Sequence, residues 1–223
     1  MKYKTDYTDF FKSIEYAVDI TYPSKGIPVL GMGSGADSGT IAAALHSCGK
    51  KFTLCCAEGN ENLDVLQDRI EYLGVPTKII TDLTDDEIIT AFSDMEQAGF
   101  TEAEFGKYRP ISHFVLSSHI PNSHLYSGLG TDEFYTNSME RLCRFMYQSH
   151  RAYHHFNIKT MFPLLKNEVF IEYYCLHPNL RNYYKQPFLE YMKSKKFPVD
   201  NSKKSFSVKK GDNIGLAPKN KVL

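Results

Sequence analysis

The feature that most constrains the fold of this chain is an alternation, through its first half, of short apolar runs with segments of helical spacing. The apolar runs cover residues 27–32, 51–57, 77–81 and 123–127. Apolar residues at helical spacing fill the intervals, over residues 38–48, 62–73, 85–98 and 112–119. Strands that alternate with helices are typical of a parallel sheet, because each crossover helix returns the chain to the same end of the sheet. The sequence therefore predicts an α/β fold with a parallel sheet.

The last third of the chain has a different pattern. Beyond Glu140 no strand signal is found, and helical spacing covers residues 139–156, 167–176 and 183–195. We therefore expect a helical lobe against the edge of the sheet. Residues 1–145 would form the α/β core, and residues 146–223 a helical lobe and basic tail within one structural unit.

The charge balance excludes some classes of partner. The 223 residues carry 26 Lys and Arg against 26 Asp and Glu, so no global field attracts nucleic acid or an anionic membrane. The 5 cysteines lack CxxC spacing, which argues against a disulfide framework or a zinc knuckle. No apolar stretch reaches membrane-spanning length. We expect a cytoplasmic protein that binds no membrane, for which nucleic acid is an unfavoured partner, and recognition must be local.

The stretch GMGSGADSGTIAAAL, residues 31–45, places a glycine turn between an apolar run and a helical pattern. Such a turn presents unpaired backbone amides at a positive helix N-terminus, where a phosphate group binds well. The spacing matches neither GxxxxGK[ST] nor GxGxxG, and Asp37 lies inside the turn. A carboxylate there is useful if it holds a magnesium ion that the phosphates also ligate. The alternative is a glycine and serine turn in which Asp37 caps a helix.

A second stretch, LYSGLGTDEFY at residues 125–135, repeats this design after another apolar run. Two glycines precede the acidic pair Asp132 and Glu133. In a parallel sheet both turns emerge at the carboxyl ends of strands, where ligands of doubly wound folds bind. Two such turns can share one nucleotide. The alternative makes Asp132 a helix cap and Glu133 a solvated first-turn residue.

Four segments together resemble one family. The order GSGADS, SGLGTDEFY, MFPLL and KKSFS is similar to the synthetase domain of the asparagine synthetase family, within the ATP-pyrophosphatase (PP-loop) superfamily. The resemblance covers residues 6–212. It implies a PP-loop core, of the adenine nucleotide alpha hydrolase-like type, and an enzyme that uses ATP with Mg²⁺.

The resemblance also implies roles for individual residues. The family's first motif grips pyrophosphate, which assigns this role to Gly33, Ser34, Gly35, Asp37 and Ser38. Its second motif places Ser127 and Gly128 beside the adenosine, and makes Asp132 a metal carboxylate together with Asp37. The catalytic residues implied are Lys203, which lies three residues before Phe206, and Lys185 in a later helix. The alternative for Lys203 is a solvated lysine of the basic tail.

The family's chemistry is amide formation through adenylation. A carboxylate attacks the α-phosphorus of ATP, pyrophosphate leaves, and an amine then displaces AMP from the acyl-adenylate. The family's glutamine-hydrolysing domain has no counterpart before residue 6. We therefore expect the partners to be a small-molecule carboxylate and an amine, with ammonia supplied free or by a separate glutaminase.

Several positions depart from the family's pattern. Gly33 and Ser34 replace the usual Ser and Gly, which preserves small size and backbone amides. Leu129 stands where asparagine synthetases carry a Glu that contacts the reacting intermediate, which weakens the case for asparagine as the product. Asn201 and Leu189 stand where an Arg is common, so fewer cations face the phosphates.

These departures leave three functional hypotheses. The first is an asparagine synthetase-type ligase without its own glutaminase. The second is another PP-loop enzyme that modifies a nucleobase or RNA, and the third is a nucleotide-binding protein that has lost catalysis. His150 and His154 share a helix face that could bind a metal, but an ordinary amphipathic helix is the favoured interpretation. The tyrosines near Arg181 could stack on bases, although packing is again favoured.

Overall fold

The fold is that of a computed structural model, which describes residues 3–57, 61–81, 84–101 and 110–200. Its sheet has five strands, all parallel, in the order β3-β2-β1-β4-β5, a Rossmann-like core. The strands are β1 (Val29–Met32), β2 (Thr53–Ala57), β3 (Thr77–Ile80), β4 (His124–Tyr126) and β5 (Lys159–Met161). The prediction of a parallel α/β sheet is confirmed, and each of the four apolar runs contains a strand.

Strand β5 contradicts the expectation that no strand follows Glu140. It pairs with β4 through the register Leu125↔Thr160, and the Ser127 N–H donates to the Met161 carbonyl at 3.0 Å. The strand is only three residues long and its Lys159 is exposed. A short edge strand needs no apolar run, because pairing with its neighbour rather than burial defines it.

The described helices begin and end close to the predicted bounds. They are α1 (Thr8–Thr21), α2 (Ala36–Ser47), α3 (Leu63–Leu73), α4 (Asp85–Gln97), α6 (Pro110–Ser118), α7 (Thr131–Tyr135), α8 (Met139–His155), α9 (Asn167–Cys175) and α10 (Gln186–Ser194). Local chemistry explains several ends: Gly74 closes α3 in the left-handed region at φ 58°, and Thr84 with Glu87 forms a capping box on α4. None of the helices in these described ranges is long and apolar enough to cross a membrane.

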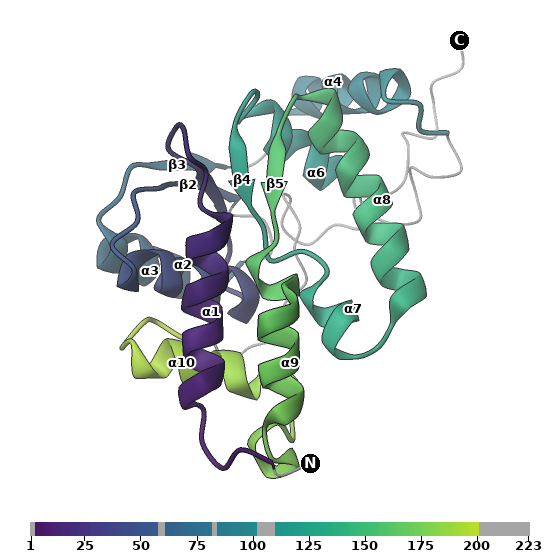
Figure 1. The fold of residues 1–223 in the computed structure, drawn as a ribbon. Coiled ribbons are helices and arrows are strands. Elements are labelled where there is room, and N and C mark those ends of the chain that lie inside the picture. The colour runs from purple at the N-terminus through teal and green to yellow at the C-terminus, as the bar shows by residue number, and fades with distance from the viewer. Residues whose placement is uncertain (1–2, 58–60, 82–83, 102–109, 201–223) are drawn as a thin grey trace.

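The sheet is covered on both faces, as a buried parallel sheet requires. Alternate residues of β2 face opposite sides: Leu54 and Cys56 belong to one hydrophobic cluster, Cys55 and Ala57 to the other. The first cluster packs against α1, α2, α3, α9 and α10, and the second against α4, α6 and α8 (Figure 1). Helix α2 is buried along nearly its whole length, which its alanine-rich sequence allows.

Residues beyond 145 contribute to both clusters. Tyr153 of α8 lies in the cluster with α4 and α6, while Tyr173 of α9 and Phe188 of α10 lie in the cluster with α1. Figure 1 shows α9 and α10 beside α1, although they are far apart in the sequence. The domain boundary at residue 145 stays a prediction. Because α10 packs in the same hydrophobic cluster as α1 and α2, it lies near the end of the sheet where α2 begins.

Candidate functional site

The two glycine turns lie against each other at the carboxyl end of the sheet. The first connects β1 to α2 and the second connects β4 to α7, and β1 pairs directly with β4. A Cβ added to Gly128 would lie 2.7 Å from the Asp37 Cβ and 3.1 Å from the Ser38 nitrogen. Only a glycine permits this approach. The expectation that both turns emerge at the carboxyl ends of parallel strands is confirmed.

A cavity of about 520 Å³ opens between these turns, over the ends of β1, β2 and β4. This volume lies within the range of small-molecule sites. The predicted site residues that line it are Gly33, Gly35, Asp37, Ser38, Ser127, Gly128, Asp132 and Lys185. Ser34 is buried behind the turn, 3% exposed. Lys203 and Asn201 lie outside the described residues.

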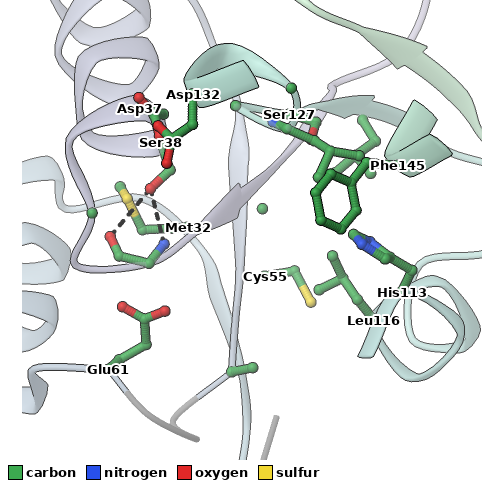
Figure 2. Close-up of a pocket in the computed structure, with 18 of the residues that line it drawn as sticks. Met32, Asp37, Ser38, Cys55, Glu61, His113, Leu116, Ser127, Asp132 and Phe145 are labelled. Atoms are coloured by element: carbon green, nitrogen blue, oxygen red, sulfur yellow. Dashed lines mark hydrogen bonds between the residues drawn. The ribbon is translucent and has the colours of Figure 1, made fainter. Parts of the chain in front are cut away.

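The first turn has the geometry of an anion cradle. Its Gly35 is the N-cap residue of α2, and no side chain caps the N–H groups of that helix. The Ser38 hydroxyl closes the turn, since it accepts from the Gly33 N–H at 3.1 Å and donates to the Gly33 carbonyl at 3.3 Å (Figure 2). The N–H of Ser34 faces a carboxylate, that of Glu61, which also lines the cavity. The turn therefore offers donors to a negative group.

Arg69 of α3 holds the opposite side of this turn. Its side chain is fully buried, and its guanidinium donates to the carbonyls of Gly33, Gly35 and Pro198. Burial lowers the pKa of Arg69 to about 10, against the charges of Glu61 and Asp200, so the group stays a cation at neutral pH. By binding the carbonyls, Arg69 fixes which way the peptide groups of the turn face.

Asp37 and Asp132 share one cation, the ammonium of Lys185. The Lys185 Nζ lies 3.0 Å from Asp37 Oδ2 and 2.7 Å from Asp132 Oδ1. Burial raises the pKa of Asp37 to about 7, with the Lys185 charge lowering it and the Asp132 charge raising it. Burial opposes the charged form of Lys185, but the two carboxylates outweigh this and raise its pKa. Figure 2 shows Asp37 and Asp132 side by side at one end of the cavity.

This pair fits the requirements of a magnesium ion bound together with phosphate. Asp37 Oδ1 is buried and has no hydrogen-bond partner within the described part of the chain, so one carboxylate oxygen is left for a cation. Mg²⁺ is commonly held by one or two carboxylates, with phosphate oxygens and water as the other ligands. Among the described residues no group of three or more His, Cys, Asp or Glu could hold a metal alone. The protein would thus supply two ligands.

Comparison with known proteins assigns no family. No protein-family model matches this chain, and no curated protein matches it. The function of the site is therefore inferred from its geometry.

The structure argues against the helix-cap and solvated interpretations of the acidic residues. The N-cap residues of α2 and α7 are Gly35 and Gly130, rather than Asp37 and Asp132. Glu133 is buried and faces Arg141 at 3.4 Å instead of being solvated.

The far end of the cavity is uncharged. The Tyr153 hydroxyl lies 3.3 Å from His113 Nδ1, and burial lowers the pKa of His113 to about 4. Burial also raises the pKa of Tyr153 and raises that of Cys55 to about 11. All three groups are therefore neutral at pH 7. Figure 2 shows His113 beside Phe145 and Leu116, across the cavity from the acidic pair.

Glu61, Arg69, His113 and the neutral end of the cavity were not predicted from the sequence. Arg69 had a visible signal, because it shares the apolar face of α3 with Leu66 and Leu73, where an arginine is unusual. His113 likewise interrupts a largely apolar helix. Glu61 carries no such signal, since its contact with the turn depends on where β2 ends.

The remaining candidates have structural roles in the described chain. His150 and His154 are exposed and their rings stack with centroids 6.3 Å apart, as on an ordinary amphipathic helix. Tyr173 is buried against aromatic rings of α1 and α10. The carbonyl of Leu164, in the MFPLL segment, accepts from the Tyr135 hydroxyl at 2.8 Å, which ties this segment to helix α7.

Proposed function

We propose that this protein is an ATP-dependent ligase of the asparagine synthetase type, built on a PP-loop core. It adenylates a carboxylate with release of pyrophosphate and forms an amide with ammonia or another amine. One observation carries the proposal: two glycine turns meet at the ends of adjacent parallel strands, and their aspartates hold one positive charge. Two carboxylates beside free backbone donors would suit a polyphosphate that carries magnesium.

Each part of the cavity would take one part of the nucleotide. The amides of the first turn suit the pyrophosphate, and Asp37 and Asp132 suit the magnesium ion that neutralises it. The end with Phe145 and His113 suits adenine, because it offers aromatic rings and no charge. Ser127 and Gly128 line the cavity between the two ends, where a ribose would lie.

In this reaction the protein would mainly orient the reactants and stabilise the charge that develops. The carboxylate oxygen of the acceptor attacks the α-phosphorus, and the bond from that phosphorus to the pyrophosphate oxygen breaks. An amine then attacks the acyl carbon, loses a proton, and AMP leaves. Backbone donors and Lys185 would stabilise the departing charge, and the resemblance assigns the same task to Lys203.

Leu129 bears on the choice of acceptor. It lines the cavity within the second turn, and its side chain can neither accept nor donate a hydrogen bond. We therefore expect the product to differ from asparagine. The acceptor carboxylate and the amine are small molecules, and a separate glutaminase is a candidate source of ammonia. We also propose a cytoplasmic location, where ATP and magnesium are available.

The test is exchange of labelled pyrophosphate into ATP in the presence of a pool of carboxylates, with Mg²⁺. We expect exchange by the parent and a loss of about 100-fold in Asp37→Asn, which keeps the shape of the side chain but not its charge. Asp64→Asn is the matched control, because Asp64 is exposed in the first turn of α3. Equal exchange in both variants would remove the assignment. ATP binding without exchange would instead favour the nucleotide-binding protein that has lost catalysis.

A further inference from the structure

The first turn already contains an anion, the carboxylate of Glu61. Its Oε2 accepts from the Ser34 N–H at 2.5 Å and from the Ser34 hydroxyl at 2.6 Å. The carboxylate lies so close to the turn that a Cβ on Gly33 would be 2.7 Å from Oε1. The Ser34 hydroxyl in turn accepts from the Asn62 N–H at 3.2 Å, which ties the residue after Glu61 to the same serine.

Two sources of positive potential lie near this carboxylate. The N–H groups at the start of α2 carry the positive end of the helix dipole, and the buried Arg69 cation adds to it from the other side of the turn. Hydrogen bonds from N–H and O–H to an ionised acceptor are about twice as strong as neutral ones. Glu61 thus makes the interactions that a phosphate oxygen would make at the same donors.

We propose that Glu61 is a specificity-determining residue that competes with the ligand for the first turn. A phosphate can reach the Ser34 donors only by displacing the Glu61 side chain, and it then lies near a carboxylate of like charge. A polyphosphate that carries Mg²⁺ brings a countercharge and gains Asp37 and Asp132 as further ligands. A single phosphate or carboxylate gains neither. Glu61 therefore selects magnesium polyphosphates over simple anions, an inference that rests on the proposed function.

Calorimetry on the full chain tests this with three probes: inorganic phosphate, pyrophosphate without magnesium, and ATP with magnesium. For Glu61→Gln we expect affinity for the two simple anions to rise about tenfold, because the variant removes both the competing charge at the donors and the repulsion by the displaced carboxylate. Affinity for magnesium ATP should rise less, by at most about threefold, because magnesium already offsets the repulsion and only the competition for the donors is removed. Glu61→Ala should give the same gain, and the exposed Asp64→Asn should give none.

The sign of the effect separates this idea from its rivals. A damaged fold cannot raise affinity, so a gain identifies competition. A loss in Glu61→Ala that Glu61→Gln restores would show that Glu61 braces the turn, and unchanged affinities in both variants would also overturn the proposal. If the gain for simple anions appears without any ATP binding, Glu61 competes as inferred while the ligase assignment fails. If ATP exchange proceeds but no anion gains affinity, the ligase assignment stands and this inference fails.

Discussion

The two glycine turns have the same design in the sequence but differ in what supports them. The first turn is held by charged groups: Arg69 binds its carbonyls and Glu61 accepts from its Ser34 donors. The second is held by apolar packing, with Leu142 and Leu165 close to Gly130, and by uncharged hydroxyl groups: Ser127 Oγ accepts from the Leu129 N–H at 3.1 Å and Thr131 Oγ1 donates to the Gly128 carbonyl at 2.7 Å. The first turn is followed by a helix of 12 residues and the second by one of 5.

This difference indicates that the two turns have different roles in binding. A turn with a full helix dipole and a fixed peptide orientation is suited to bind an anion, because its donors need no rearrangement. A turn packed on leucines, with Gly130 in the left-handed region at φ 82°, is suited to place one side chain, Asp132, at a defined point. The sequence motif alone would give both turns the same role.

The largest effect should follow from removing the charged support of the first turn. Arg69→Met removes the buried guanidinium that donates to three carbonyls, and we expect unfolding in urea to show a loss of about 3–5 kcal/mol. Arg69→Lys should lose less, because it keeps the charge but not the fork of donors. Arg144→Met, which breaks a surface pair with Glu140, should lose at most about 0.5 kcal/mol.

Nuclear magnetic resonance of the glycine amides shows whether this support is local. In Arg69→Lys the amide signals of Gly33 and Gly35 should move, while those of Gly128 and Gly130 stay close to their parent positions. Equal shift changes in both turns would mean that they form one rigid unit and do not have separate supports.

A smaller effect is expected where the two turns touch. Gly128→Ala places a methyl group against Asp37 and the Ser38 backbone, so the two turns must move apart. We expect a loss of about 1–3 kcal/mol in stability, and weaker magnesium-dependent ATP binding because Asp37 and Asp132 separate. Gly35→Ala is the control for stability, since a Cβ there meets nothing within 4 Å and its φ of −66° suits alanine, so only the N-cap preference for glycine, at most about 1 kcal/mol, is lost. A stable Gly128→Ala protein would show that the contact can relax.

The sequence predicted the sheet and both turns because these depend on local pattern. Apolar runs and glycine positions are set by burial and by backbone angles, and both leave a trace in the residues themselves. Asp37, Asp132 and Lys185, whose charges meet at the site, were also named. They came from motifs and a resemblance, and not from the periodicity.

What the sequence could not predict depends on pairing and on distance. Strand β5 exists because β4 offers it an edge, and its own residues carry no strand pattern. Glu61 reaches the first turn because β2 pairs with β1 in one register, Met32↔Cys56, which brings the end of β2 level with the turn. A one-residue slip would remove the contact. Lys203, the sharpest expectation of the resemblance, lies outside the described residues and stays a prediction.

The smallest effect, a dependence on pH, tests whether the acidic pair binds a cation. Burial raises the pKa of Asp37 to about 7, so below that pH its carboxyl group keeps a proton that a metal must displace. Apparent affinity for magnesium ATP should therefore rise with pH between 6 and 8, by at most about tenfold per unit below the pKa. The terminal phosphate of ATP also titrates at a pH of about 6. The pH dependence of affinity in Asp37→Asn measures this contribution alone. The slope that belongs to Asp37 is the difference between the two proteins.

The folding stability of the ligand-free protein should depend on pH with the opposite sign to its affinity for magnesium ATP. Between the usual carboxyl pKa of 3.8 and about 7 the folded state binds more protons at Asp37 than the unfolded chain, so this residue makes stability fall as the pH rises. The neighbouring Lys185 does not oppose this trend, because its pKa is raised and it stays charged, and His113, with a pKa of about 4, is already neutral above pH 6. Urea unfolding at pH 6 and pH 8, with and without magnesium ATP, compares the two signs directly. Identical slopes in the parent and in Asp37→Asn would mean that Asp37 is ionised throughout and that Lys185, rather than a metal, is its permanent partner.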